Sequence, residues 1–129
     1  MQLRIARPVN DLHRSQQLYC QGMGMQLLGE FSDHQGHSGI MLGYAGESWH
    51  LEFTHCLHHP AAPASTAEDL LVLYLPAEAV WLARCEAMQA AGFRTITPFN
   101  PYWETAARTF IDEDGYRTVI RLGSWPAVS

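Results

Sequence analysis

The segment Leu70–Leu75 (LLVLYL) marks the point at which the chain starts a second copy of its own pattern. Six consecutive apolar or aromatic residues predict a β-strand. Residues 77–91 then form an alanine-rich segment that closes on Gly92, as a helix does. A strand and a helix also open the chain, because Leu3–Val9 predicts a strand and Asp11 can cap a helix. The order of elements therefore begins twice.

Three further strands are predicted after each helix. They cover residues 25–31, 38–44 and 49–55 in the first half, and 94–98, 109–111 and 116–122 in the second. Both halves therefore have the order βαβββ, and Gly24 and Gly92 hold matching places after the two helices. This repeat predicts an α+β fold, in which two modules in a pseudo-twofold arrangement form a cupped mixed sheet with the helices outside.

The buried stripe of each helix can be predicted from its period. In the first helix, ended by Gly22 and Gly24, the stripe is Leu12, Gln16, Tyr19, Cys20 and Met23. In the second helix it is Val80, Ala83, Ala87 and Ala91, flanked by Trp81 and Met88.

Composition favours one soluble domain in residues 1–129, with module one at 1–57, a linker at 58–69 and module two at 70–129. A chain of 129 residues with 47% hydrophobic content is long enough for one ordinary core. The segment 58–69 contains two prolines and four alanines without a hydrophobic period, as a linker does. No cysteine pair has the spacing of a CxxC site, and three cysteines are an odd number, so we expect free thiols.

Charge and hydropathy exclude two classes of partner. The formal net charge is −5, and the eight Lys and Arg residues are scattered, so we expect no nucleic-acid partner. We expect no membrane partner either, because no apolar run approaches the roughly 20 residues that a span needs. A cytoplasmic location is the default expectation.

Four short motifs, in this order, carry a resemblance to a known superfamily. They are Val9–Ser15 (VNDLHRS), Gly24-Met25, Leu51–Thr54 (LEFT) and Phe110–Arg117 (FIDEDGYR). Together they resemble the vicinal oxygen chelate superfamily, which includes glyoxalases, extradiol dioxygenases, and fosfomycin- and bleomycin-resistance proteins. The segment 100–103 (NPYW) is also similar to uncharacterised bacterial members. The resemblance covers essentially the whole chain and implies the paired βαβββ fold.

The resemblance also implies where a metal ion would bind. Members that use a metal place ligands on the first and last strand of each half, and the matching positions here are Arg4, Glu52, Leu70 and Val119. Only Glu52 can be a metal ligand, and Arg4 brings a positive charge to the place of the cation. We therefore expect no metal cofactor, with a divalent metal at Glu52 as the alternative.

Strand alternation predicts which side chains face the pocket. In the strand 49–55, Trp49, Leu51 and Phe53 share one face, and His50, Glu52 and Thr54 share the other. The apolar face is expected to pack on a helix, and the polar face to line a cavity. The predicted ligand-binding residues are Arg4, His50, Glu52, Leu70, Val72, Tyr74, Asn100, Tyr102, Trp103, Val119 and Arg121, with Ala6 and Arg117 on the same strand faces.

Arg4, His50 and Glu52 each allow two interpretations. Arg4 either forms a salt bridge with Glu52 in place of the lost metal or projects into water. His50 is a candidate catalytic residue beside Glu52, as an acid and base pair. The alternative is that His50 makes an ordinary hydrogen bond on a half-exposed strand.

Three other groups were weighed as sites. His55, His58 and His59 could bind zinc, but adjacent histidines in a linker cannot easily aim at one ion. Residues 112–115 (DEDG) lack the ligand spacing of a calcium loop and predict a hairpin turn. Tyr102 and Trp103 lie in an irregular segment and either stack on a ligand or pack in the core.

Three functions remain open on the sequence alone. The leading one is a metal-independent pocket that sequesters a small molecule such as a drug or metabolite, or that transfers protons through Glu52 and His50. The second is a divalent-metal-dependent lyase, isomerase or dioxygenase of the glyoxalase type. The third is an interaction module with a filled cavity. The resemblance also allows a homodimer, and the sequence does not decide between monomer and dimer.

Overall fold

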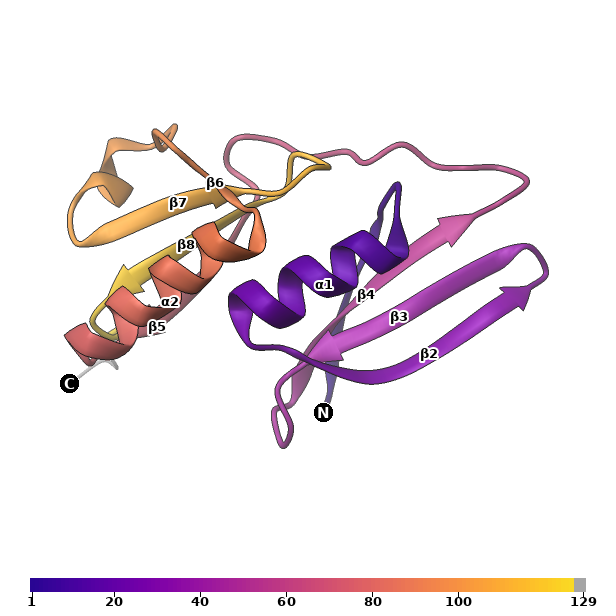
Figure 1. Cartoon of the computed structure of the whole chain (residues 1–129), viewed down its shortest axis with the longest axis horizontal. Coiled ribbons are helices and arrows are strands. Elements are labelled where there is room, and N and C mark those ends of the chain that lie inside the picture. The colour runs from indigo at the N-terminus through magenta and orange to yellow at the C-terminus, as the bar shows by residue number, and fades with distance from the viewer. Residues whose placement is uncertain (127–129) are drawn as a thin grey trace. The chain divides into compact units, whose positions relative to one another are not determined.

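Each half of the chain folds into a four-stranded mixed sheet that carries one α-helix on one face (Figure 1). The computed structural model describes residues 1–126. The chain divides into two units, with the boundary between Ala64 and Ser65. We call the half before this boundary unit 1 and the half after it unit 2.

Unit 1 contains the first βαβββ module. Its elements are β1 (Leu3–Pro8), α1 (Leu12–Met23), β2 (Gln26–His34), β3 (His37–Gly43) and β4 (Trp49–Cys56). The strands lie in the order β1-β4-β3-β2, with β1 parallel to β4 and the other neighbours antiparallel. The two ends of the module therefore meet at the β1–β4 pair.

Unit 2 repeats this topology. Its elements are β5 (Leu70–Leu75), α2 (Glu78–Ala91), β6 (Arg94–Ile96), a short 3₁₀-helix η1 (Pro101–Glu104), β7 (Ala107–Ile111) and β8 (Arg117–Leu122). The strand order is β5-β8-β7-β6, and β5 runs parallel to β8. The predicted α+β class and the double βαβββ order are thus confirmed.

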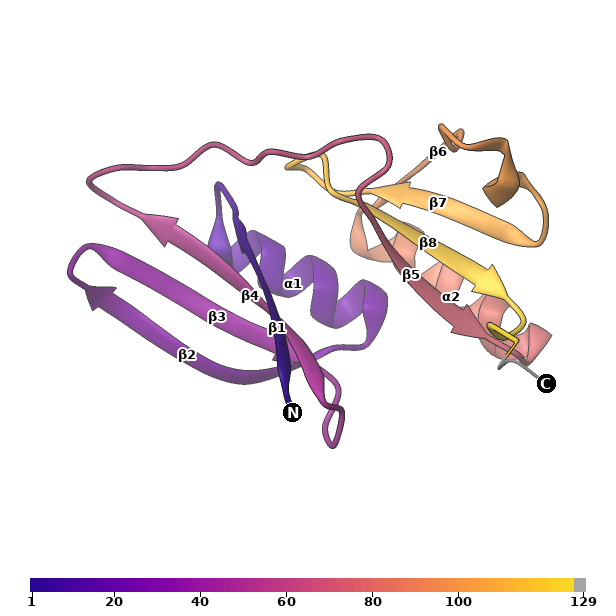
Figure 2. The ribbon, with the colours of Figure 1, turned by 180° about the vertical axis from the view of Figure 1, so that it is seen from behind.

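In unit 1, α1 covers one face of the sheet, as comparison of Figures 1 and 2 shows. Tyr19 of α1 meets Phe53 of β4 edge to face, with ring centroids 4.8 Å apart. Leu51 and Phe53 are both fully buried, so the apolar face of β4 packs on the helix as alternation predicted. The opposite face of the sheet carries no helix from unit 1, whose residues 1–64 are all described.

In unit 2, α2 packs against its own sheet through a smaller set of side chains. Cys85 and Met88 are its buried residues, and Phe110 of β7 is also fully buried. The Arg108 guanidinium lies 5.0 Å from the ring centre of Trp81, a cation–π contact that joins β7 to α2. This contact places Arg108 on the helix-covered face of the sheet.

Several predicted details of the helices were wrong. α1 continues through Gly22 and ends at Met23, with Gly24 as its left-handed cap at φ 71°. Its buried residues are Ser15, Leu18, Tyr19, Gly22 and Met23, a stripe rotated from the predicted one. The predicted stripe of α2 is wrong at Val80, which is 53% exposed, whereas Met88, predicted to flank the stripe, is fully buried.

The strand boundaries also differ from the prediction. β2 runs on to His34, β6 stops at Ile96, and β7 begins at Ala107.

None of the helices in residues 1–126 is long and apolar enough to cross a membrane.

Candidate functional site

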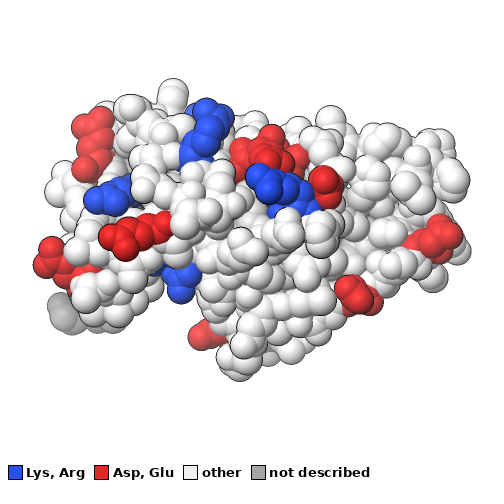
Figure 3. Space-filling model, viewed as in Figure 1, with Lys and Arg blue, Asp and Glu red and all other residues white. Residues whose placement is uncertain are grey.

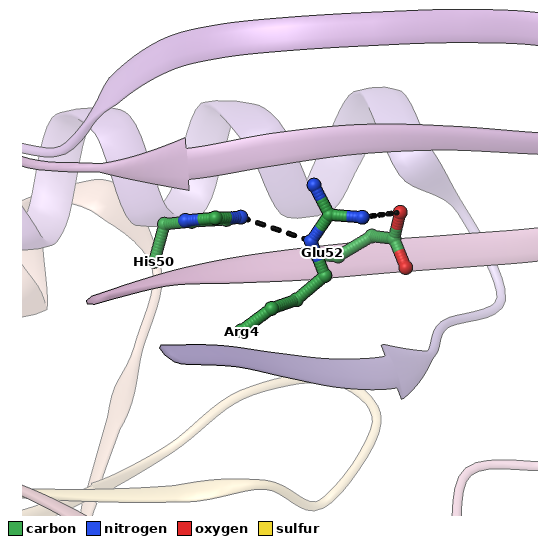
Figure 4. Close-up of polar contacts among 3 residues, drawn as sticks. All are labelled: Arg4, His50 and Glu52. Atoms are coloured by element: carbon green, nitrogen blue, oxygen red, sulfur yellow. Dashed lines mark hydrogen bonds and ion pairs between the residues drawn. The ribbon is translucent and has the colours of Figure 1, made fainter. Parts of the chain in front are cut away.

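The face of the unit 1 sheet opposite α1 gathers three of the predicted site residues. Arg4 lies on β1, and His50 and Glu52 lie on β4, in register with Arg4 and Ala6. Because side chains alternate along a strand, these residues point away from the buried Leu51. Figure 4 shows the three side chains in front of the sheet, with α1 behind it. We call Arg4, His50 and Glu52 the polar triad.

The Arg4 guanidinium links the other two members of the polar triad. Its Nε donates to Nε2 of His50 at 2.9 Å, and its Nη1 donates to Oε2 of Glu52 at 3.2 Å (Figure 4). The second contact is also an ion pair, in which the Arg4 side chain is 47% exposed and the Glu52 side chain 15%. The predicted salt bridge is therefore present, in preference to an Arg4 that projects freely into water.

The direction of these bonds fixes the state of the histidine ring. A guanidinium can only donate, so Nε2 of His50 must carry a lone pair and the ring proton resides on Nδ1. His50 and Glu52 thus both bond to the guanidinium of Arg4. Two acceptors, the neutral imidazole of His50 and the carboxylate of Glu52, therefore hold the Arg4 guanidinium in one orientation.

Apolar side chains lie beside the polar triad on the same face. A Cβ at Gly43 would come within 3.1 Å of Cδ1 of Leu28 and 3.2 Å of Cβ of His50, so Leu28 covers the backbone next to the histidine. A Cβ at Gly39 would come within 2.5 Å of the Phe31 ring. Met41 lies between the two glycines on β3, in register with Glu52. We call Leu28, Phe31 and Met41 the apolar strip.

The sequence analysis missed the apolar strip, although one signal was available. Gly39, Met41 and Gly43 occupy alternate positions of β3 and therefore one face of it. Glycines at alternate positions leave room for neighbouring side chains to lie across the strand. This pattern predicts a strand covered by side chains from β2 and β4.

The predicted site residues of unit 2 form a different surface. Leu70, Val72 and Tyr74 of β5 are half-buried, and Val72 lies in register with Val119, which is fully buried. Arg121 lies in register with Tyr74, and its Nη1 donates to the carbonyl oxygen of Leu122. This group contains no carboxylate.

The segment with the two aromatic residues is more ordered than predicted. Pro101–Glu104 forms η1, which Asn100 caps by accepting from the backbone N–H of Tyr102 at 3.0 Å. The rings of Tyr102 and Trp103 meet edge to face at 4.9 Å, and Tyr102 is 60% exposed. Asn100 therefore has a structural role in this segment.

His55 of β4 and the linker residues His58 and His59 do not converge. Nδ1 of His55 lies 3.2 Å from the carbonyl oxygen of Val9, and the His58 ring lies over Gly36 in the β2–β3 turn. Within residues 1–126, no group of three or more His, Cys, Asp or Glu side chains is placed to hold a metal ion. At the positions matching the superfamily's ligands, one carboxylate beside a guanidinium does not fit a divalent cation.

The charges of the molecule are mixed. Both acidic and basic side chains appear on the face seen in Figure 3, and the chain as a whole carries a formal charge of −5. The single positive charge in the polar triad is therefore a local feature, matched by Glu52.

Comparison with known families divides the chain as its topology does. Residues 3–54 match the YycE-like N-terminal domain, and residues 68–121 match the YycE-like C-terminal domain. The uncharacterized protein YycE of Bacillus subtilis (strain 168) is 36% identical over 119 residues, which is 92% of this chain and 86% of that protein.

Solved structures agree on the fold. The crystal structure of the YycE protein of unknown function from Bacillus subtilis has a TM-score of 0.89 at 34% identity, covering 99% of this chain and 93% of that chain. A trypanothione-dependent glyoxalase I of Leishmania major has a TM-score of 0.72 at 17% identity, covering 95% and 86%. TnmS3, an antibiotic binding protein from Streptomyces sp. CB03234, has a TM-score of 0.65 at 20% identity, covering 96% of each chain. The resemblance to the glyoxalase and antibiotic-resistance proteins of the vicinal oxygen chelate superfamily is thus confirmed as a shared fold, and the chain belongs to the YycE-like family.

Proposed function

We propose that the helix-free face of unit 1 binds a small organic molecule without a metal ion. The observation that carries this proposal is the guanidinium of Arg4, which is held between His50 and Glu52 at 2.9 and 3.2 Å while its side chain remains 47% exposed. Two anchoring contacts hold the group in one orientation, so less conformational entropy is lost when a ligand binds.

The composition of the face also supports a ligand. Binding sites for small molecules combine apolar walls with a few fixed polar groups. The apolar strip supplies the first, because Phe31 and Met41 are half-buried and Leu28 is 46% exposed. The polar triad supplies the second. TnmS3, which has the same fold, is an antibiotic binding protein, and this supports a binding role for the face.

The donor set supports metal independence. Glu52 is the only oxygen ligand at the positions where the resemblance implies metal ligands in unit 1, and its Oε2 already accepts from Arg4. A cation placed there would meet the guanidinium charge, so we expect the ion pair to persist in the presence of divalent metals.

The test is a binding screen in which small organic fragments are added to the full chain and nuclear magnetic resonance detects binding. We expect some fragments to shift the signals of Arg4, His50 and Glu52, and this response to disappear in Arg4→Ala. Arg14→Ala is the matched control, since Arg14 is an exposed arginine on α1, on the other face of the sheet.

Two results would overturn the proposal. One is a fragment response confined to residues outside this face. The other is stoichiometric binding of Zn²⁺, Ni²⁺, Mn²⁺ or Fe²⁺ that shifts the Glu52 signals, a result that would favour the metal-dependent lyase, isomerase or dioxygenase.

A further inference from the structure

The polar triad is electrically neutral as a unit. Arg4 carries one positive charge and Glu52 one negative charge, 3.2 Å apart. His50 is neutral in this arrangement because its Nε2 accepts a hydrogen bond from Arg4. A charged ligand would therefore lose its hydration at this site without meeting an uncompensated opposite charge.

The two central atoms of the ion pair still have hydrogen-bonding capacity. Nη1 of Arg4 bears two hydrogens, and Oε2 of Glu52 has more than one lone pair, so their mutual bond leaves a donor on one and an acceptor on the other. These atoms lie 3.2 Å apart. One planar group with an acceptor beside a donor, such as a primary amide, can bond to both.

The rest of the ligand is defined by the apolar strip. Met41 pairs in register with Glu52, and Leu28 approaches the same side of Gly43 as His50 does. The Phe31 ring extends this surface over Gly39. A molecule whose polar edge reaches Arg4 and Glu52 therefore meets side chains that favour an apolar or aromatic body.

We infer that this face selects an uncharged, planar molecule with an apolar body and an amide-like edge, in which a hydrogen-bond acceptor adjoins a donor. This inference rests on the proposed function, because it names the ligand class of the same face. Arg4 donates to the acceptor of the ligand, and Glu52 accepts from its donor. His50 is a positioning residue that holds the Arg4 guanidinium in its plane.

Three probes with the same phenyl body, which differ in charge and in their hydrogen-bond donors and acceptors, test the inference on the full chain. They are benzamide, which has the amide edge, benzoate, which is anionic, and benzamidinium, which is cationic. Dissociation constants come from titrations that follow the signals of Arg4, His50 and Glu52. We expect benzamide to bind about tenfold more tightly than either charged probe, the size of effect expected when a charged group gains or loses one hydrogen bond.

Two variants should change the preference in opposite directions. Glu52→Gln leaves the Arg4 charge uncompensated, so benzoate should become the tightest of the three probes. Arg4→Gln leaves the Glu52 charge uncompensated, so benzamidinium should become the tightest. Arg14→Gln, on the far side of the sheet, should keep the wild-type order, and unchanged signals elsewhere in the chain show that each variant is folded.

The outcomes separate the ligand class from the proposed function. If benzoate or benzamidinium binds the wild-type face as tightly as benzamide, or if the variants keep the wild-type order, the inference is wrong. If other fragments bind the face and none of the three probes does, the inference is wrong while the proposed function stands. If no compound shifts the signals of this face, both are wrong.

Discussion

The parallel strand pairs β1–β4 and β5–β8 share one scaffold and carry different chemistry. Each pair aligns six residues of one strand with six of the other. Arg4 lies opposite His50 in unit 1, and Leu70 lies opposite Arg117 at the matching place in unit 2. The backbone repeats, whereas the chemistry of the helix-free face does not.

The contrast between the two units is sharper two residues further along β4 and β8. Glu52 in unit 1 has a side chain that is 15% exposed and paired with Arg4, whereas Val119 in unit 2 is fully buried. The same register position thus holds a compensated charge in one unit and a core residue in the other. The position along the strand decides to which face a side chain points. The side chain on the neighbouring strand then decides whether a charge is tolerated there.

The largest expected effect comes from placing the unit 1 residue in unit 2. Val119→Glu should lower the free energy of unfolding by about 3–5 kcal/mol, because it places a charged carboxylate at a fully buried position of the core. The reverse change, Glu52→Val, should cost no more than about 1 kcal/mol, since a partly exposed ion pair contributes little. Urea denaturation followed by tryptophan fluorescence measures both.

Equal costs for the two changes would show that the two positions have similar surroundings. That result would remove the distinction between a polar face in unit 1 and an apolar one in unit 2. Val119→Thr is a useful control, because it nearly keeps the size of the side chain and adds a polar group without a full charge.

A smaller effect is expected at the starts of the two helices. Asp11 caps α1 by accepting from the backbone N–H of Arg14 at 3.0 Å, whereas Ala77 precedes α2 with extended backbone and no capping side chain. Asp11→Ala should therefore destabilise the protein by about 1 kcal/mol. Ala77→Asp should stabilise it by about 0.5–1 kcal/mol, as a new cap does.

Thermal and urea unfolding of the two single variants and the double variant measure these effects. The double variant should unfold close to the wild type, because the two sites lie in separate units and should act independently. A destabilising Ala77→Asp would show that the start of α2 has no room for a cap.

The comparison also shows what the sequence could predict. The double βαβββ order followed from strand and helix signals, and the alternation in β4 placed Leu51 and Phe53 against the helix. The stripe of α2 could not be predicted, because an alanine-rich helix has little contrast between its faces. Cys85 and Met88 became the buried residues there through packing with the sheet.

The polar triad could be predicted only in part. Alternation assigned His50 and Glu52 to one face, and the family resemblance placed Arg4 opposite Glu52. That Arg4 bonds to both depends on side-chain geometry, which spacing does not give. The apolar strip was missed because the register between β2 and β3 shifts at two places, between Leu27 and Gly29 and between Phe31 and His34. These shifts change which face a side chain takes.

Each helix carries a thiol whose pKa is raised by burial, Cys20 on α1 and Cys85 on α2, and the effect on stability is confined to alkaline pH. Burial raises the pKa of the Cys85 thiol above its ordinary value of 9.0, and the nearby Arg108 guanidinium opposes this rise. The pKa of this thiol is higher in the folded protein than in the unfolded chain. The free energy of unfolding therefore keeps its full value below the unfolded pKa and falls as pH rises through the folded pKa. Cys85 alone should contribute a loss of less than about 1.4 kcal/mol to the free energy of unfolding for each pH unit above 9, measured by urea unfolding between pH 8 and 10.5.

Cys85→Ala should make this alkaline loss smaller while lowering stability at pH 8, because it leaves a small cavity. Cys20 on α1 is the matched thiol of unit 1, whose pKa is also raised by burial, and there no opposing cation is involved. Cys20→Ala should therefore remove a part of the alkaline loss too. If both variants keep the full wild-type loss between pH 9 and 10.5, groups other than these thiols cause it.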